Sequence, residues 1–249
     1  MPLVDPVTMS PPAGNAKTKD LGLPTQAIPT IPTPLAQGVR HVHPILLLSF
    51  FLVRFNALVS DPVSTMWTSL PVVVAIQSTY AIVCLPAAGS QTAKPAKKLR
   101  PGEKKSASSD GTVPNVAVTT VVALVLTTLA TSVLHTFFVL FGAPLLTHLP
   151  HTSLCSLYLS LLGLFPLFYT HGVSNKEWLE ILGARAPFDE AFGGLMGGCV
   201  GAWVGAVPIP LDWDREWQKW PVTILCGVFG GYVLGKLVGG TVAFGRRFG

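Results

Sequence analysis

Charge is scarce in this 249-residue chain: Asp, Glu, Lys and Arg together make up 12% of it, about half the roughly 25% usual in soluble domains. Apolar residues make up 49%, and the mean hydropathy is +0.53. This balance excludes an ordinary water-soluble domain and indicates a membrane protein. The net charge of +5 does not indicate nucleic-acid binding, because the basic residues lie in loops between apolar runs.

Cysteines and catalytic motifs are sparse as well. Each of the four cysteines stands alone inside an apolar segment, so neither a disulfide nor a cysteine metal site is expected. The chain has no Gly-x-Ser-x-Gly, His-Glu-x-x-His or Gly-Lys-Ser/Thr motif. His148 and His151 are three residues apart, but Pro150 opposes a regular helix and no third ligand is near. We therefore expect no catalytic residues, no metal and no cofactor.

Two apolar stretches near the C-terminus carry glycine at every fourth position. The glycines are Gly193, Gly197, Gly201 and Gly205 in the first stretch, and Gly227, Gly231, Gly235 and Gly239 in the second. In water so much glycine would weaken a helix by roughly 1 kcal/mol per residue, but in lipid the backbone has to keep its hydrogen bonds. A glycine strip lets a second helix approach closely, so we expect glycine-zipper packing. The strips either meet a partner or pack on one another as a hairpin.

Six apolar runs are long enough to cross the roughly 30 Å hydrocarbon core of a bilayer. They cover residues 42–60, 66–88, 115–141, 152–170, 190–208 and 221–243. The predicted fold is therefore all-α, a polytopic membrane domain of about six helices over residues 42–243. Residues 1–41 contain eight prolines and no apolar run, and they are expected to be a disordered tail. A disordered basic linker is expected at 89–114, and a short basic C-terminus at 244–249.

The basic residues predict the orientation of the chain. Thirteen of the seventeen Lys and Arg residues fall on one side of the six runs. Arg215 and Lys219 fall on the other side, while Arg54 and Lys236 lie within runs. Since positive loops stay in the cytosol, both termini are predicted to be cytosolic and the loop between the last two runs to be lumenal.

That lumenal loop is rich in tryptophan and charge. It contains Asp212, Trp213, Asp214, Arg215, Trp217 and Trp220. The three tryptophans recur at i, i+4 and i+7, so they would share one face of a helix. They either anchor a hairpin turn at the membrane surface as an aromatic belt, or form a platform for a partner's lumenal domain or a lipid headgroup.

Three ionisable side chains within the apolar runs are candidates for a function: Arg54, His135 and Lys236. Ionisable groups at membrane depth tend to be functional. For Arg54 and Lys236 we expect a salt bridge or a headgroup contact, and Lys236 is close enough to the cytosolic end to extend toward it. For His135 we expect an interhelical hydrogen bond.

The stretch that joins the two glycine runs resembles a known family. It reads Gly201-Ala-Trp-Val-Gly205-Ala-Val-Pro208-Ile-Pro-Leu-Asp212-Trp-Asp-Arg215. This pattern is similar to the signature of the PIG-F family of glycosylphosphatidylinositol (GPI) anchor biosynthesis. Phe141-Gly-Ala-Pro144 and His171-Gly172 resemble the same family. The likeness runs from about Val42 to the C-terminus and leaves out the tail and the basic linker.

The resemblance implies a multi-pass subunit of the endoplasmic reticulum membrane without catalytic activity of its own. Such subunits stabilise large ethanolamine-phosphate transferases, PIG-O-like and PIG-G-like, which add phosphoethanolamine to mannoses of the anchor precursor. The glycine strips would then be the partner interface, and the lumenal loop would meet the partner or membrane lipids. The alternative is a lipid transporter or scramblase, or a lipid-modifying membrane enzyme that uses His135, Arg54 or the lumenal aspartates.

Overall fold

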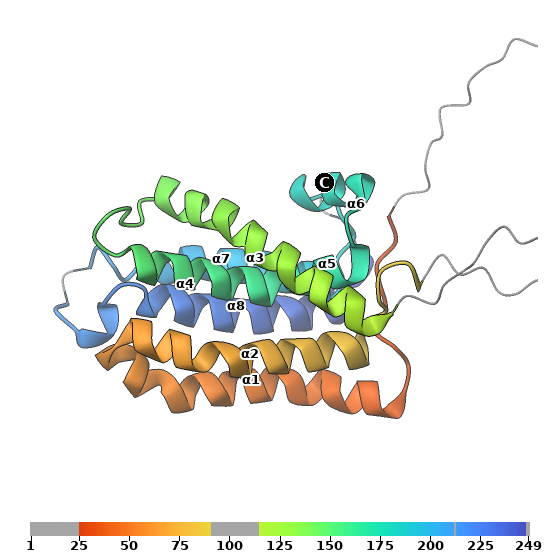
Figure 1. Cartoon of the computed structure of the whole chain (residues 1–249), viewed down its shortest axis with the longest axis horizontal. Coiled ribbons are helices and arrows are strands. Elements are labelled where there is room, and N and C mark those ends of the chain that lie inside the picture. The colour runs from red at the N-terminus through yellow and green to blue at the C-terminus, as the bar shows by residue number, and fades with distance from the viewer. Residues whose placement is uncertain (1–24, 91–114, 212, 248–249) are drawn as a thin grey trace, which may run out of the picture.

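The structure, a computed structural model, describes residues 25–90, 115–211 and 213–247. The described residues contain helices and no strand. The helices are α1 (Pro34–Ser60), α2 (Pro62–Cys84), α3 (Val116–Leu140), α4 (Leu149–Leu159), the π-helix η2 (Ser160–Leu164), α5 (Phe165–His171), α6 (Asn175–Leu182), α7 (Glu190–Ala206), the 3-10 helix η3 (Glu216–Gln218) and α8 (Val222–Gly240). This content confirms the all-α prediction. The helices α1, α2, α7 and α8 run roughly side by side, and α3 crosses the bundle obliquely (Figure 1).

Five helical segments of the described chain are long and apolar enough to cross a membrane. They are α1, α2, α3, the continuous segment Leu149–His171 and α8. Each coincides with a predicted span. α7 coincides with the remaining predicted span, 190–208, but its 17 residues extend only about 26 Å, less than the roughly 30 Å of the hydrocarbon core. Its crossing of the membrane stays a prediction.

α1 begins eight residues before the first predicted span. Thr33 caps it, and Pro34 occupies its first position, where the missing N–H has no helical partner to lose. The residues before the cap also contact the bundle. The backbone N–H of Ile31 donates to the carbonyl of Cys84 at 2.8 Å, and Ile28 is buried. The tail predicted for 1–41 is therefore too long. Its first 24 residues and most of the predicted linker lie outside the described residues.

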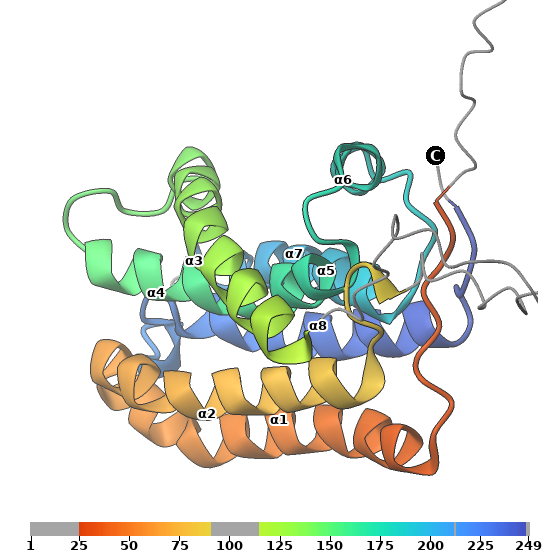
Figure 2. The same ribbon diagram turned by 45° about the vertical axis from the view of Figure 1, so that its right-hand side comes forward.

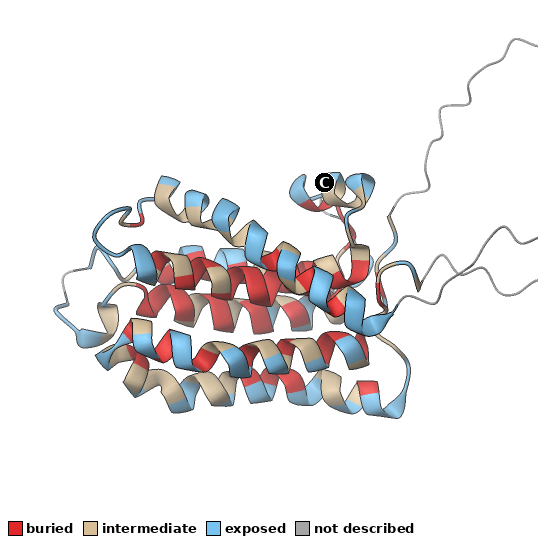
Figure 3. Cartoon of the chain, viewed as in Figure 1, coloured by how far each residue is buried: buried red, intermediate tan, exposed pale blue. Residues whose placement is uncertain are grey.

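The segment Leu149–His171 and α8 form the centre of the bundle (Figures 2 and 3). The apolar window of Leu149–His171 is 83% buried, compared with 56% for α8 and 17% for α3. α1 and α2 pair with each other and cover one side of this centre, α7 packs along α8, and α3 crosses α4 and α5. Most of the α3 surface therefore faces outward.

The connections alternate between the two ends of the bundle (Figure 1). Asp61 and residues 141–148 and 207–221 turn the chain at one end, while residues 172–189 and the C-terminal residues lie at the other, where α1 begins. The second end carries Lys176, Arg185, Arg246 and Arg247, and the first carries Arg215 and Lys219. More of these basic residues therefore lie at the second end of the bundle, as the predicted orientation with both termini in the cytosol requires. Which end faces the cytosol stays a prediction.

Candidate functional site

The two glycine strips face each other along α7 and α8. A Cβ added at Gly197 would lie 2.7 Å from the Cα of Gly235, and one added at Gly231 would lie 2.8 Å from the Cα of Gly201. Real Cβ atoms essentially never come closer than 3.0 Å to such atoms. The contact between the two helices is therefore backbone on backbone, which only glycine permits.

The same close contact extends along the whole seam between α7 and α8. Added Cβ atoms at Gly193, Gly205, Gly227 and Gly239 would likewise meet backbone atoms of the opposite helix or its cap. Of the two arrangements that the sequence left open, the structure has the hairpin. This corrects the assignment of the eight glycines as a partner interface, because each strip is already covered by the other. A partner has to contact other surfaces of the chain.

A buried ion cluster lies at the end of this seam. Glu190, the first residue of α7, accepts from Lys236 Nζ of α8 at 3.1 Å and also pairs with Arg40 of α1. The side chains of Lys236 and Glu190 are only 1% and 5% exposed. The hydroxyl of Tyr80 on α2 donates to the same carboxylate at 2.6 Å, and Lys236 Nζ lies 4.2 Å from the centre of the Tyr80 ring. Buried charges are tolerated when they are paired in this way, so the cluster joins four helices.

A chain of neutral hydrogen bonds extends the cluster into the middle of the bundle. His43 Nε2 lies 2.8 Å from Gln77 Oε1, which also accepts from the Tyr232 hydroxyl at 3.4 Å. The Gln77 amide donates to the carbonyls of Leu161 and Leu162 at 3.3 and 3.2 Å. Both carbonyls belong to η2, where the wider π-helical turn changes the regular backbone pairing. The π-turn therefore provides the acceptors that satisfy a buried amide.

The sequence identified only one member of this cluster. Lys236 was expected to form a salt bridge or to extend toward the cytosol, and the structure places it in a buried salt bridge. Glu190 was missed, although it is the sole carboxylate within the six predicted spans. A single carboxylate in an apolar span indicates a buried cationic partner, so the sequence did contain a signal for Glu190. His43, Gln77 and Tyr80 carry no comparable signal, because nothing in the sequence indicates that their side chains converge.

The other two intramembrane polar residues lie elsewhere. Arg54, toward the opposite end of α1, donates from Nε to Ser69 Oγ at 3.3 Å and from Nη2 to Thr68 Oγ1 at 2.7 Å, both on α2. His135 of α3 has its Nδ1 3.4 Å from the Oγ of Ser153 on α4. This is the kind of interhelical contact that we expected for His135. The three polar residues therefore do not form one common site.

The connection between α7 and α8 is organised by Gln218. Its amide donates to the carbonyls of Pro208 and Leu211 at 2.8 and 2.6 Å, and its Oε1 accepts from the N–H of Arg215 at 3.0 Å. Among the described residues of this connection, helix is limited to η3. The single helical face on which we placed three tryptophans is therefore not formed, because Gln218 holds the chain in a compact loop instead.

The tryptophans of this loop divide into a pair and an anchor. The rings of Trp213 and Trp217 lie 5.8 Å apart, and Trp213 is 53% exposed. Trp220 turns inward and donates from Nε1 to Thr152 Oγ1 of α4 at 3.2 Å. Asp214 is exposed and has a φ of +46°, while Asp212 lies outside the described residues. The described aromatic surface of the loop is thus the Trp213–Trp217 pair.

Asp189 connects the start of α7 to the segment before α1. Its carboxylate accepts from the N–H of Phe192 at 2.9 Å and from the N–H of Ile28 at 3.1 Å. Burial raises the pKa of this carboxyl, while the two backbone donors oppose the rise. The residue is the helix cap of α7, and it also fixes the chain that leads into α1.

The polar groups that converge in the described part of the chain pair mainly with one another. Among those residues no group of three or more His, Cys, Asp or Glu side chains is placed to hold a metal ion. The rings of His148 and His151 do lie 5.1 Å apart, near the start of α4. The arrangement that the structure does build fixes helices against each other, through the glycine seam and the ion cluster.

Residues 42–240 match the family described as "GPI biosynthesis protein family Pig-F". The chain belongs to this family. This Pig-F member is 50% identical over 274 residues to the Neurospora crassa "Glycosylphosphatidylinositol anchor biosynthesis protein 11", with all of both chains covered. It is 37% identical over 108 residues to the human "GPI ethanolamine phosphate transferase, stabilizing subunit", which covers 42% of this chain and 49% of the human one. No solved structure matches.

The Pig-F match confirms the resemblance that residues 201–215 carried. It extends from α1 to the last residue of α8 and so includes both glycine strips. It also includes Glu190 and Lys236, while Arg40 lies two residues before its start.

Proposed function

We propose that this Pig-F member is a non-catalytic subunit of the endoplasmic reticulum membrane that binds and stabilises GPI ethanolamine-phosphate transferases. These enzymes, PIG-O-like and PIG-G-like, add phosphoethanolamine to mannoses of the GPI precursor. The names of the human and mouse relatives, each a stabilising subunit of a GPI ethanolamine phosphate transferase, support this role. The structural observation that supports it is a bundle fixed internally by the seam and the ion cluster, with a separate apolar face left outside.

The outer face of α7 is the partner surface that we propose. Val200, Trp203 and Val204 are 56%, 70% and 54% exposed and lie away from the glycine seam. A helix of 17 residues is shorter than the bilayer core, and oligomerisation is one way in which membranes accommodate short helices. Trp213, exposed just beyond the end of α7, would continue the same surface toward the partner's lumenal domain.

Affinity purification tests this proposal. The tagged full chain is extracted from cells in mild detergent, and co-purifying proteins are identified by mass spectrometry. We expect a large membrane phosphotransferase in near-stoichiometric amount. Trp203→Ala should lower its yield, while Trp67→Ala, which removes an exposed tryptophan of α2 outside the proposed surface, should not. A folded, monodisperse chain without a phosphotransferase, or one that alone moves phosphatidylethanolamine across vesicle membranes, would contradict the proposal.

A further inference from the structure

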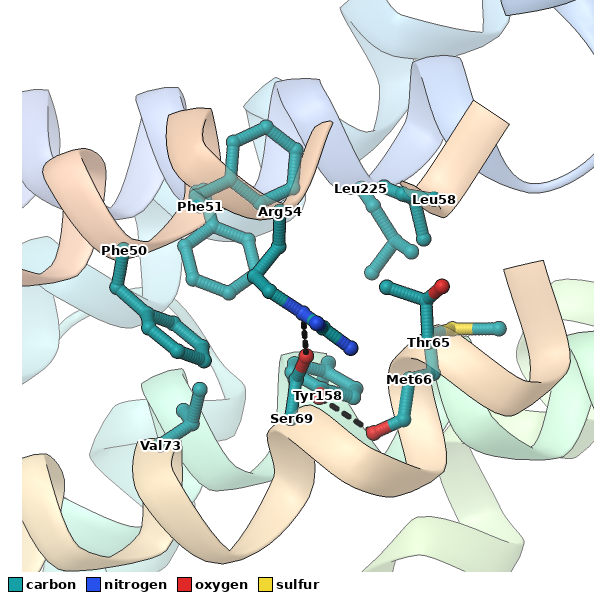
Figure 4. A pocket seen from close by; sticks show the side chains of 11 residues that line it. Phe50, Phe51, Arg54, Leu58, Thr65, Met66, Ser69, Val73, Tyr158 and Leu225 are labelled. Atoms are coloured by element: carbon teal, nitrogen blue, oxygen red, sulfur yellow. Dashed lines mark hydrogen bonds between the residues drawn. The ribbon is translucent and has the colours of Figure 1, made fainter. Parts of the chain in front are cut away.

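A pocket opens between α1 and α2, near the end of the bundle opposite the ion cluster. It is lined by Phe50, Phe51, Arg54, Leu58, Thr65, Met66, Ser69, Val73, Tyr158, Leu225 and Phe229. Figure 4 shows the Arg54 side chain extending from α1 toward Ser69, with Phe50 to one side and Thr65 to the other. The pocket contains about 310 Å³ of empty space, part of it open to the surroundings. The enclosed part that a water-sized sphere can enter is only about 20 Å³, roughly the room of one water molecule, so a ligand here lies at the opening of the pocket, against the guanidinium, rather than inside it.

Arg54 brings unused hydrogen-bond donors to this apolar pocket. A guanidinium has five N–H groups. In the described part of the chain one donates to Ser69 and one to Thr68, both neutral hydroxyls, and no ion pair there involves Arg54. Three N–H groups remain in the fork that suits two oxygens of a phosphate or a carboxylate. A cation in an apolar setting is stabilised by such an anion.

The depth of Arg54 fits a lipid phosphate. α1 has 27 residues and is about 40 Å long, so each end extends roughly 5 Å beyond a 30 Å hydrocarbon core. Arg54 is six residues from the end of α1, about 9 Å along the axis, and a long arginine side chain spans the short distance left to the headgroups. Trp67 lies five residues into α2 and is exposed, as expected of an aromatic residue at the interface.

The surroundings favour a lipid over a partner's carboxylate. Leu52 and Val53, next to Arg54 on α1, are 68% and 81% exposed apolar side chains and therefore face the acyl chains. The hydroxyl of Tyr158 at the back of the pocket is already committed to the carbonyl of Met66 at 2.8 Å. Arg54 is thus the charged group that the pocket offers. We propose that this pocket binds the phosphate of a membrane glycerophospholipid through the Arg54 guanidinium.

The lipid itself supplies the first test. The full chain, purified in detergent, is mixed with phosphatidylethanolamine or with a diacylglycerol of the same acyl chains, and bound lipid is counted by native mass spectrometry. We expect one retained phosphatidylethanolamine and no retained diacylglycerol, since only the former has a phosphate. Equal retention of the two lipids, or retention of neither, would overturn the proposal. This comparison needs no variant and is unaffected by folding defects.

Substitutions then assign the binding to Arg54. Arg54→Met should reduce phosphatidylethanolamine retention by roughly tenfold or more, the effect of a lost charge-assisted hydrogen bond. Arg54→Lys should keep most of it, because the charge remains. Arg246→Met, which removes an exposed arginine at the other end of the bundle, should leave it unchanged. Unchanged retention in Arg54→Met refutes the assignment, and if that variant instead loses a co-purifying transferase, the anion is a partner's carboxylate. The transferase plays no part in the lipid measurement, so either proposal can fail alone.

Discussion

Alanine at Gly231 should destabilise the bundle, whereas alanine at the neighbouring Gly230 should not. An added Cβ at Gly230 meets no atom within 4 Å, but at Gly231 it would lie 2.8 Å from the Cα of Gly201. Carbon atoms pack best at roughly 3.5–4.0 Å, so α7 and α8 have to separate by about 1 Å. Overpacking of this kind costs about 1–3 kcal/mol. The upper part of that range applies, because the obstructing atom is backbone and cannot rotate away.

The comparison of these two variants isolates the steric effect. Both replace glycine by alanine inside α8, so both gain the same helix propensity. The full-length variants are unfolded by titration with SDS in mixed micelles, and the loss of helix is followed by far-UV circular dichroism. Gly231→Ala should unfold with a free energy about 2–3 kcal/mol below that of Gly230→Ala. Equal unfolding of the two variants would show that α7 and α8 are not in backbone contact, and the reasoning would be refuted.

Three further predictions concern polar contacts and use the same detergent-solubilised chain. Glu190→Gln leaves the buried Lys236 and the partly buried Arg40 without a carboxylate and should cost about 3–5 kcal/mol in SDS titration; a stability equal to wild type would contradict the ion cluster. Trp220→Phe removes the 3.2 Å bond to Thr152 and should cost about 0.5–1.5 kcal/mol, and no loss would mean that this tryptophan is not an anchor. Because burial raises the pKa of Asp189 above its usual 3.8, the folded state holds this proton more tightly, so thermal stability should fall as pH rises from 3.8 to the folded pKa and stay level above it. Asp189→Asn should lack that fall, and an identical pH profile would exclude Asp189 as its source.

The membrane-spanning helices could be predicted from sequence because lipid imposes both a length and an apolar composition on them. α1, α2, α3, Leu149–His171 and α8 all fall on predicted runs. Their ends were less predictable, because caps rather than apolar residues fix them. Thr33 and Pro34 start α1 before its apolar run begins, so hydropathy alone placed the boundary too late.

The contacts between helices could be predicted less well. A glycine at every fourth position indicates a close helix neighbour, but a partner and a hairpin satisfy the same pattern. Glu190 and Arg40 are far apart in the chain and become a pair only because α1 and α7 meet at one end of α8. The prediction that the three loop tryptophans share a helical face was wrong for a local reason. Their spacing is that of a helix, but hydrogen bonds from Gln218 to two backbone carbonyls hold the chain in a turn.

The glycine seam and the ion cluster depend on each other. A Cβ added at Gly240 would lie 2.6 Å from Glu190 Cγ and 2.9 Å from Arg40 Nη2, so this glycine leaves the space in which the two charges pair. Lys236 stands between two seam glycines in the sequence, and its Nζ reaches Glu190 at 3.1 Å across the seam. A Cβ at a seam position would force α7 and α8 apart by about 1 Å, because carbon atoms need that much more room. The distance between Lys236 Nζ and the Glu190 carboxylate would then exceed that of a close ion pair, while both groups stay buried. The glycines therefore do more than bring two helices together: they set the distance at which the buried charges pair inside the bundle, and so hold the outer face of α7 in a fixed position.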